Sequence, residues 1–96
     1  YVMSDGEYDY MLGRVTDALK NYEDALEYYE MAIVKGDPDK YYGCSASLYA
    51  GLIYEEQKKF AKARQYFEKC LSLYPEGYSA SLHQKAKSGL NRIGNK

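Results

Sequence analysis

The sequence of 96 residues has no tryptophan, one threonine, one histidine, two cysteines and no long apolar run. A helix needs roughly 20 mostly apolar residues to cross a bilayer, so we expect neither a transmembrane helix nor a membrane partner. The single threonine and the lack of alternating apolar runs between turn residues argue against β-strands. Cys44 and Cys70 are far apart and not clustered with histidine, so the ligands of a zinc site are missing.

Residues that could catalyse a reaction are equally scarce. Cys44 or Cys70 with His83 would lack the third group that orients a base, and Glu55 and Glu56 are adjacent, which points them about 100° apart on a helix. The eight glycines are dispersed and form no phosphate-binding loop. We therefore predict that the chain is not an enzyme and has no catalytic residues, no metal site and no cofactor.

Composition indicates one compact globular domain spanning residues 1–96, because 46% of residues are apolar and 28% charged. Both cysteines are interpreted as free thiols, with Cys70 acting as a small buried apolar residue. Free thiols favour a reducing compartment, so we expect a cytoplasmic protein.

Charge is distributed unevenly along the chain. Residues 1–43 contain ten acids and four bases, whereas residues 44–96 contain nine bases and four acids. Solvated helix faces would explain this pattern. Head-to-tail self-association, or an acidic partner at the C-terminal end, is the alternative.

The chain contains an internal repeat. A shift of 38 residues places Gly13 on Gly51, Tyr22 on Phe60, Ala25 on Ala63, Tyr29 on Phe67 and Ala32 on Cys70. A shift of 34 residues places the segment 45–48 on 79–82. The sequence therefore holds two full units and the beginning of a third.

Each unit has helical periodicity. One apolar face is formed by Ala25, Tyr29, Ala32 and Ile33, and its counterpart by Phe60, Ala63, Phe67, Cys70, Leu71 and Tyr74. Turn residues at 36–38 and 75–77 separate the segments. We predict an all-α fold with five helices, at about 7–20, 23–35, 41–57, 60–73 and 78–93. Gly13 and Gly51 fall inside helices, where glycine costs about 1 kcal/mol relative to alanine. We expect close helix packing at both places, with Ala25 and Ala63 as the small residues opposite.

This pattern resembles the tetratricopeptide repeat, which has Leu-Gly on its first helix and an alanine, an aromatic and a small residue on its second. The matching residues are Leu12, Gly13, Ala25, Tyr29 and Ala32 in the first unit, and Gly51, Tyr54, Ala63, Phe67, Cys70 and Pro75 in the second. The resemblance implies an α-α superhelix, a right-handed solenoid. Its repeats would span about 6–37 and 44–77, and a capping helix would span about 78–93. Asp9 and Ser47 stand where the family has tryptophan.

The predicted last helix has an apolar stripe, formed by Tyr78, Leu82, Ala86, Leu90 and Ile93, and a polar opposite side that includes His83. Terminal repeats need such a polar face, so we expect the array to end here. No similar cap precedes Gly6, and further repeats or a second copy could cover that end.

The family resemblance also implies a concave groove lined by the first helix of each hairpin. Its side chains would be Tyr10, Arg14, Asp17, Leu48, Leu52, Glu55 and Leu82. The lysine, asparagine and arginine that grip a C-terminal carboxylate in this family are absent from these places, so we do not expect that mode of binding. We expect Leu48, Leu52 and Leu82 to form an exposed apolar patch, unless the central helix buries them.

A protein-protein interaction module that binds a peptide or helix of a partner protein is therefore the first functional hypothesis. The alternative is a structural repeat segment that self-associates, as a homo-oligomer, or stacks on further repeats. Nucleic-acid binding is a weaker hypothesis, because Phe60, Phe67 and Tyr74, which lie among the basic residues, are assigned to the buried face rather than to a stacking surface.

Overall fold

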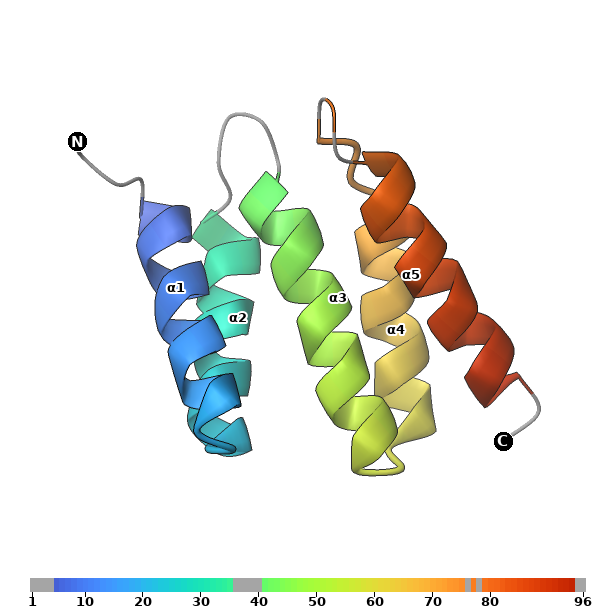
Figure 1. The fold of residues 1–96 in the computed structure, drawn as a ribbon, viewed down its shortest axis with the longest axis horizontal. Helices are drawn as coiled ribbons and strands as arrows, with labels where there is room; N and C mark the ends of the chain where they lie inside the picture. The colour runs from blue at the N-terminus through green and yellow to red at the C-terminus, as the bar shows by residue number, and fades with distance from the viewer. Residues whose placement is uncertain (1–4, 36–40, 76, 78, 95–96) are drawn as a thin grey trace.

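The computed structural model describes residues 5–35, 41–75, 77 and 79–94, and these residues form helices and no strand (Figure 1). The helices are α1 (Asp5–Ala18), α2 (Tyr22–Lys35), α3 (Tyr41–Glu56), α4 (Phe60–Leu71) and α5 (Ser79–Ile93). The predicted all-α fold and its order of helices are confirmed. The predicted turn at 36–38 and the predicted stripe residue Tyr78 lie outside the described residues.

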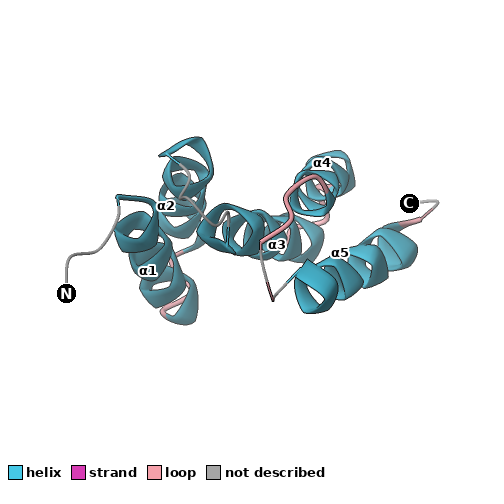
Figure 2. Ribbon diagram, turned by 90° about the horizontal axis from the view of Figure 1, so that it is seen from above, coloured by secondary structure: helices cyan, strands magenta, loops and turns pink. Residues whose placement is uncertain are grey.

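The helices form a flat array of two layers, with extents of 44 × 29 × 18 Å. Seen from above, α2 and α4 lie on one side, α1 and α5 on the other, and α3 between them (Figure 2). α3 contacts each of the other four helices. This central position explains why α3 is buried on several faces at once, although its sequence has no single apolar stripe.

Both hairpins turn in the same way. Lys20 and Lys58, which the 38-residue repeat aligns, have positive φ angles of 63°. The amide of the next residue donates a hydrogen bond of 2.8 Å back to the carbonyl of Thr16 in the first turn and Tyr54 in the second. A left-handed residue ends a helix, so α1 and α3 stop at Ala18 and Glu56, earlier than the predicted ends at 20 and 57. Sequence alone did not indicate this, because glycine is the usual residue in that conformation.

Two apolar clusters form the core, one on each side of α3. The first joins α2 to α3 and contains Ala25, Tyr29, Ala32, Ala46, Ala50 and Ile53. The second joins α3, α4 and α5 and contains Cys44, Leu48, Ala63, Phe67, Cys70, Leu82, Ala86 and Ile93. The core therefore runs continuously through the array rather than being confined within each hairpin.

The two repeated glycines make room for aromatic rings. A Cβ atom at Gly13 would lie 2.6 Å from the ring of Tyr29, and one at Gly51 would lie 2.7 Å from the ring of Phe67. The prediction of close packing is correct, but the nearest partner is the ring and not the alanine we expected. Gly89 on α5 also lies close to this ring, since a Cβ atom there would be 2.5 Å from the ring of Phe67. This third contact was not predicted, although Gly89 follows Gly51 by the same 38 residues.

Polar residues occupy both places where the family has tryptophan, and both are buried. Asp9 is 3% exposed, and its carboxylate lies 2.8 Å from the amine of Lys35 on α2. The hydrogen bond that Lys35 donates to Asp9 raises the pKa of Lys35. Ser47 is fully buried and donates a 2.8 Å hydrogen bond to the carbonyl of Gly43, within α3. An ion pair and a hydroxyl thus replace the packing that an indole ring would supply.

Cys44 and Cys70 are free, fully buried thiols whose sulfur atoms lie 3.4 Å apart. The hydrogen bond with Cys44, followed by burial, raises the pKa of the Cys70 thiol. Because the thiolate is the reactive form, we expect native protein to react with dithiobisnitrobenzoate at least about 100-fold more slowly than unfolded protein. Absorbance of the released nitrothiobenzoate measures this rate. Rapid reaction of either thiol while the circular dichroism stays native would contradict the packing of α3 on α4.

Candidate partner-binding groove

α1, α3 and α5 form one side of the array, and α3 lies set back between the other two (Figure 2). The family resemblance implied a concave groove on this side. The predicted groove residues come from these three helices: Tyr10, Arg14 and Asp17 from α1, Leu48, Leu52 and Glu55 from α3, and Leu82 from α5. Their environments differ, and the structure separates them into three groups.

Tyr10 begins a cluster of aromatic rings at the α1 end of the groove. Its ring centroid lies between 5.4 and 6.5 Å from those of Tyr29, Tyr41, Tyr42 and Tyr49. Its hydroxyl accepts a 2.9 Å hydrogen bond from Ser45 on α3. Burial raises the pKa of Tyr10, and the hydrogen bond from Ser45 partly offsets this increase. The half-buried ring therefore joins α1 to α3 and leaves only its edge for a ligand.

Arg14 and Asp17 are engaged with neighbours. The guanidinium of Arg14 lies 3.8 Å from the ring centroid of Tyr49 and 3.6 Å from the carboxylate of Asp17. Tyr29, on α2, donates a 2.8 Å hydrogen bond to the same carboxylate. Burial is the largest cause of the raised pKa of Tyr29. This end of the groove is thus a preformed polar network, with its charges already paired.

The expected exposure of Leu48 and Leu82 is wrong. Leu48 is fully buried and Leu82 is 8% exposed, and both belong to the core cluster around Phe67. The reason is that α5 packs directly on α3 and α4 and covers the face we expected to be open. Leu52 differs, because it is half-buried and packs only against the edge of this cluster. Leu52 is therefore the leucine of the three that borders the groove.

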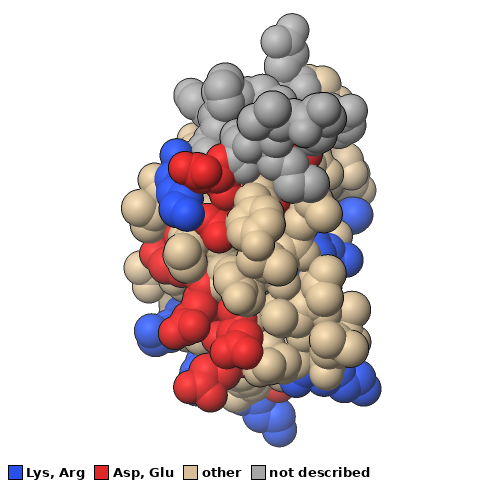
Figure 3. Space-filling view, turned by 90° about the vertical axis from the view of Figure 1, so that its left-hand side faces the viewer, with Lys and Arg blue, Asp and Glu red and all other residues tan. Residues whose placement is uncertain are grey.

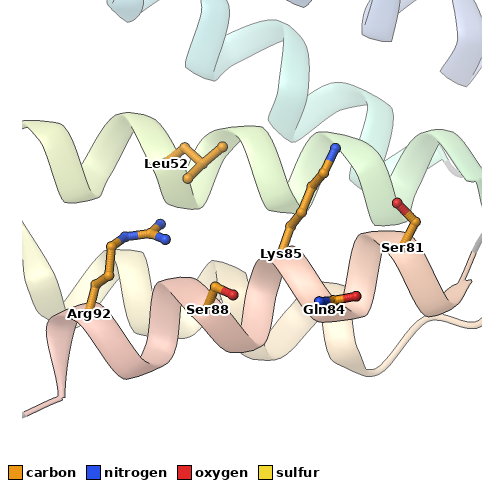
Figure 4. Close-up of a pocket in the computed structure, with 6 residues that line it drawn as sticks. All are labelled: Leu52, Ser81, Gln84, Lys85, Ser88 and Arg92. Atoms are coloured by element: carbon orange, nitrogen blue, oxygen red, sulfur yellow. The ribbon is translucent and has the colours of Figure 1, made fainter.

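A pocket of about 430 Å³ opens between α3 and α5 (Figure 4). Leu52 is its apolar residue from α3, and α5 supplies Ser81, Gln84, Lys85, Ser88 and Arg92. Lys85 and Arg92 extend from α5 toward α3 (Figure 4). Sequence reasoning missed these five residues, because Gln84, Lys85 and Arg92 were assigned to the polar face of a capping helix and Ser81 and Ser88 were given no role. Their spacing of three or four residues was the available signal, since it puts them on one side of α5.

Arg92, which lines this pocket, pairs with Glu55 of α3. Two nitrogen atoms of Arg92 each lie 2.8 Å from a carboxylate oxygen of Glu55. This bidentate pair ties α5 to α3, and the hydrogen bonds that Arg92 donates to Glu55 raise the pKa of Arg92. Among the described residues Lys85 has no ion pair, so it is the cation available to a ligand.

Two other expectations concern the C-terminal half. Tyr74 was assigned to the buried face of the fourth helix, but it is 70% exposed, because α4 ends at Leu71 and Tyr74 follows in the linker. Its ring makes an edge contact with His83. His83 was expected on the wet face and is instead half-buried, with Nε2 lying 2.6 Å from the carbonyl of Leu73. His83 therefore has a structural contact with the linker.

A second pocket, of about 640 Å³, lies on the opposite side of the array between α2 and α4. Its residues include Ile33, Val34, Lys69 and Glu30, and the hydroxyl of Tyr66 donates a hydrogen bond to Glu30 across it. The described residues contain no group of three or more histidine, cysteine, aspartate or glutamate side chains placed to hold a metal. Nor does this part of the chain include a helix with the length and apolarity needed to cross a membrane.

These features define an all-α helical-repeat protein. A family model for the tetratricopeptide repeat matches residues 6–76, which is most of the chain, and the chain belongs to this family. Searches of curated proteins and of solved structures found no match. Tetratricopeptide repeats generally mediate protein-protein interaction and are typically non-catalytic.

Proposed function

We propose that this domain binds a segment of a partner protein in the pocket between α3 and α5, with an apolar side chain against Leu52 and a carboxylate against Lys85. The observation that carries this proposal is the juxtaposition of one apolar residue with one available cation in a pocket of about 430 Å³. Ser81, Gln84 and Ser88 line the same pocket and supply hydrogen-bonding groups for a backbone or a polar side chain.

The polar network at the α1 end supports this assignment of the binding position. Arg14 and Asp17 already pair with each other and with Tyr29, so a ligand charge would have to disrupt existing contacts there. At the α5 end, Lys85 requires no such exchange. We therefore place the charged contact at α5 and an aromatic contact, if the ligand extends further, on Tyr10.

Peptides selected from a random phage-displayed library against the immobilised domain test the proposal. We expect them to carry aspartate or glutamate next to an apolar residue. Lys85→Glu is expected to weaken their binding about 10–100-fold by calorimetry, the effect of losing one charge-assisted hydrogen bond. Lys87→Glu is the matched control, because Lys87 is exposed on the same helix but does not line the pocket. Equal losses in the two variants would mean that net charge, and not the pocket, governs binding.

A further inference from the structure

The outer side of α1 carries a stripe of large apolar side chains that no described residue covers. Tyr8 is 55% exposed, Met11 44%, Val15 54% and Leu19, in the turn after α1, 74%. Their spacing of three or four residues places them on one side of the helix. The inner side of α1 is different, because Gly6 and Gly13 are buried there and Gly13 meets the ring of Tyr29. We call these four residues the α1 stripe.

α1, which carries this stripe, lies at one end of the array (Figure 1). The stripe is separate from the concave groove, because the groove residues Tyr10, Arg14 and Asp17 contact α2 and α3 side chains instead. From Tyr8 to Leu19 the stripe spans about 16 Å, since each helical residue rises about 1.5 Å. That length suits one amphipathic helix of three to four turns, packed along α1.

Acidic side chains flank the stripe. Residues 5–35 contain eight acids and three bases, a net charge of −5. On α2, Asp24 and Met31 are exposed and lie seven residues apart, which places them on one side of the helix. Glu27 lies on another side, where it lines a pocket with Tyr54 of α3 and Tyr66 of α4. Figure 3 shows acidic side chains gathered beside a surface of uncharged residues on this end of the molecule. A ligand that covers the stripe would therefore place its flank against negative charge.

We infer that the α1 stripe, with the acids of α2, docks a basic amphipathic helix of a partner protein. Its apolar side would cover Met11 and Val15, and its lysine or arginine side chains would face Asp24.

A second copy of this chain fits the face less well. The exposed side of α5 carries bases but none of the large exposed apolar side chains, so it would match the charge and leave the stripe uncovered. Two α1 stripes packed together would bring acidic flanks against each other. A helix that combines apolar and basic residues satisfies both requirements at once.

Two synthetic peptides test this inference, each a fluorescein-labelled helix with the same leucine stripe and with either lysine or glutamate on its flanks. We expect the lysine peptide to bind in fluorescence anisotropy, more weakly as salt rises, and the glutamate peptide not to bind. Val15→Ser and Asp24→Lys are each expected to weaken binding at least about tenfold. Val34→Ser is the control, because Val34 is an exposed apolar residue of α2 outside the stripe. Lys85→Glu separates this face from the groove and should change binding by less than about twofold.

Circular dichroism establishes that each variant is folded, and Met11→Ser replaces Val15→Ser if the latter is not. Equal losses in Val15→Ser and Val34→Ser would overturn the inference, because binding would then be unspecific. Sedimentation provides the other decisive result. A parent chain that self-associates, a Val15→Ser variant that is monomeric, and a lysine peptide that does not compete would together assign the stripe to a second copy.

Discussion

Phe67→Ala is expected to lower the free energy of unfolding by about 3–5 kcal/mol, a large part of the stability of a domain this size. Phe67 is fully buried and belongs to the cluster that joins α3, α4 and α5. Its ring lies against Gly51 on α3 and Gly89 on α5, so its removal leaves a cavity where three helices meet. Urea denaturation followed by circular dichroism measures the change. A midpoint close to that of the parent would show that the ring is not at the centre of the core.

Enlarging a glycine next to the Phe67 ring tests the same packing from the opposite side. Gly51→Leu should also destabilise, typically by 1–3 kcal/mol or more, because its side chain needs space that the Phe67 ring fills. Gly43→Ala is the matched control on the same helix, since a Cβ there lies 3.5 Å from Leu73, an ordinary contact. Alanine favours helix, so this variant should be at least as stable as the parent. Equal destabilisation at both positions would indicate a general intolerance of α3 to substitution.

Leu48→Ala is expected to cost about 2–5 kcal/mol, the usual range for a fully buried leucine. This result would mark Leu48 as a core residue, in contrast to the groove role that its position in the repeat implied. Leu52→Ala, the same change one turn later on α3, is the control and should cost less, because Leu52 is half-buried. Both values come from the same urea titrations. If Leu48→Ala left stability unchanged and weakened the binding of selected peptides, Leu48 would instead be a ligand-binding residue of the groove.

The α3–α5 pocket and the α1 stripe are two different surfaces, and the ligands proposed for them carry opposite charges. The pocket offers Lys85 to an acidic segment, whereas the acids of α2 favour a basic one. The uneven distribution of charge along the sequence is therefore expressed at the two ends of the folded array. A partner that engaged both surfaces would need acidic and basic segments of its own.

The sequence by itself determined the fold class and the helix order. Helical periodicity is local, and the recurrence of Gly13 and Tyr29 as Gly51 and Phe67 records a contact that each hairpin must make. The pattern that carried the family resemblance is made of these contacts. It could therefore be recognised without knowing how the hairpins pack on one another.

Only the tertiary structure decided which groove residues remain accessible. Leu48 and Leu52 are one turn apart with the same chemistry, and their different burial depends on where α5 crosses α3. The pairing of Glu55 with Arg92 joins residues 37 positions apart and follows from the same crossing. Such contacts depend on how one repeat unit packs on the next. A repeat pattern in the sequence reflects only the contacts within each unit. For that reason the sequence predicted a groove lined by α1, α3 and α5 but assigned two buried leucines to its surface.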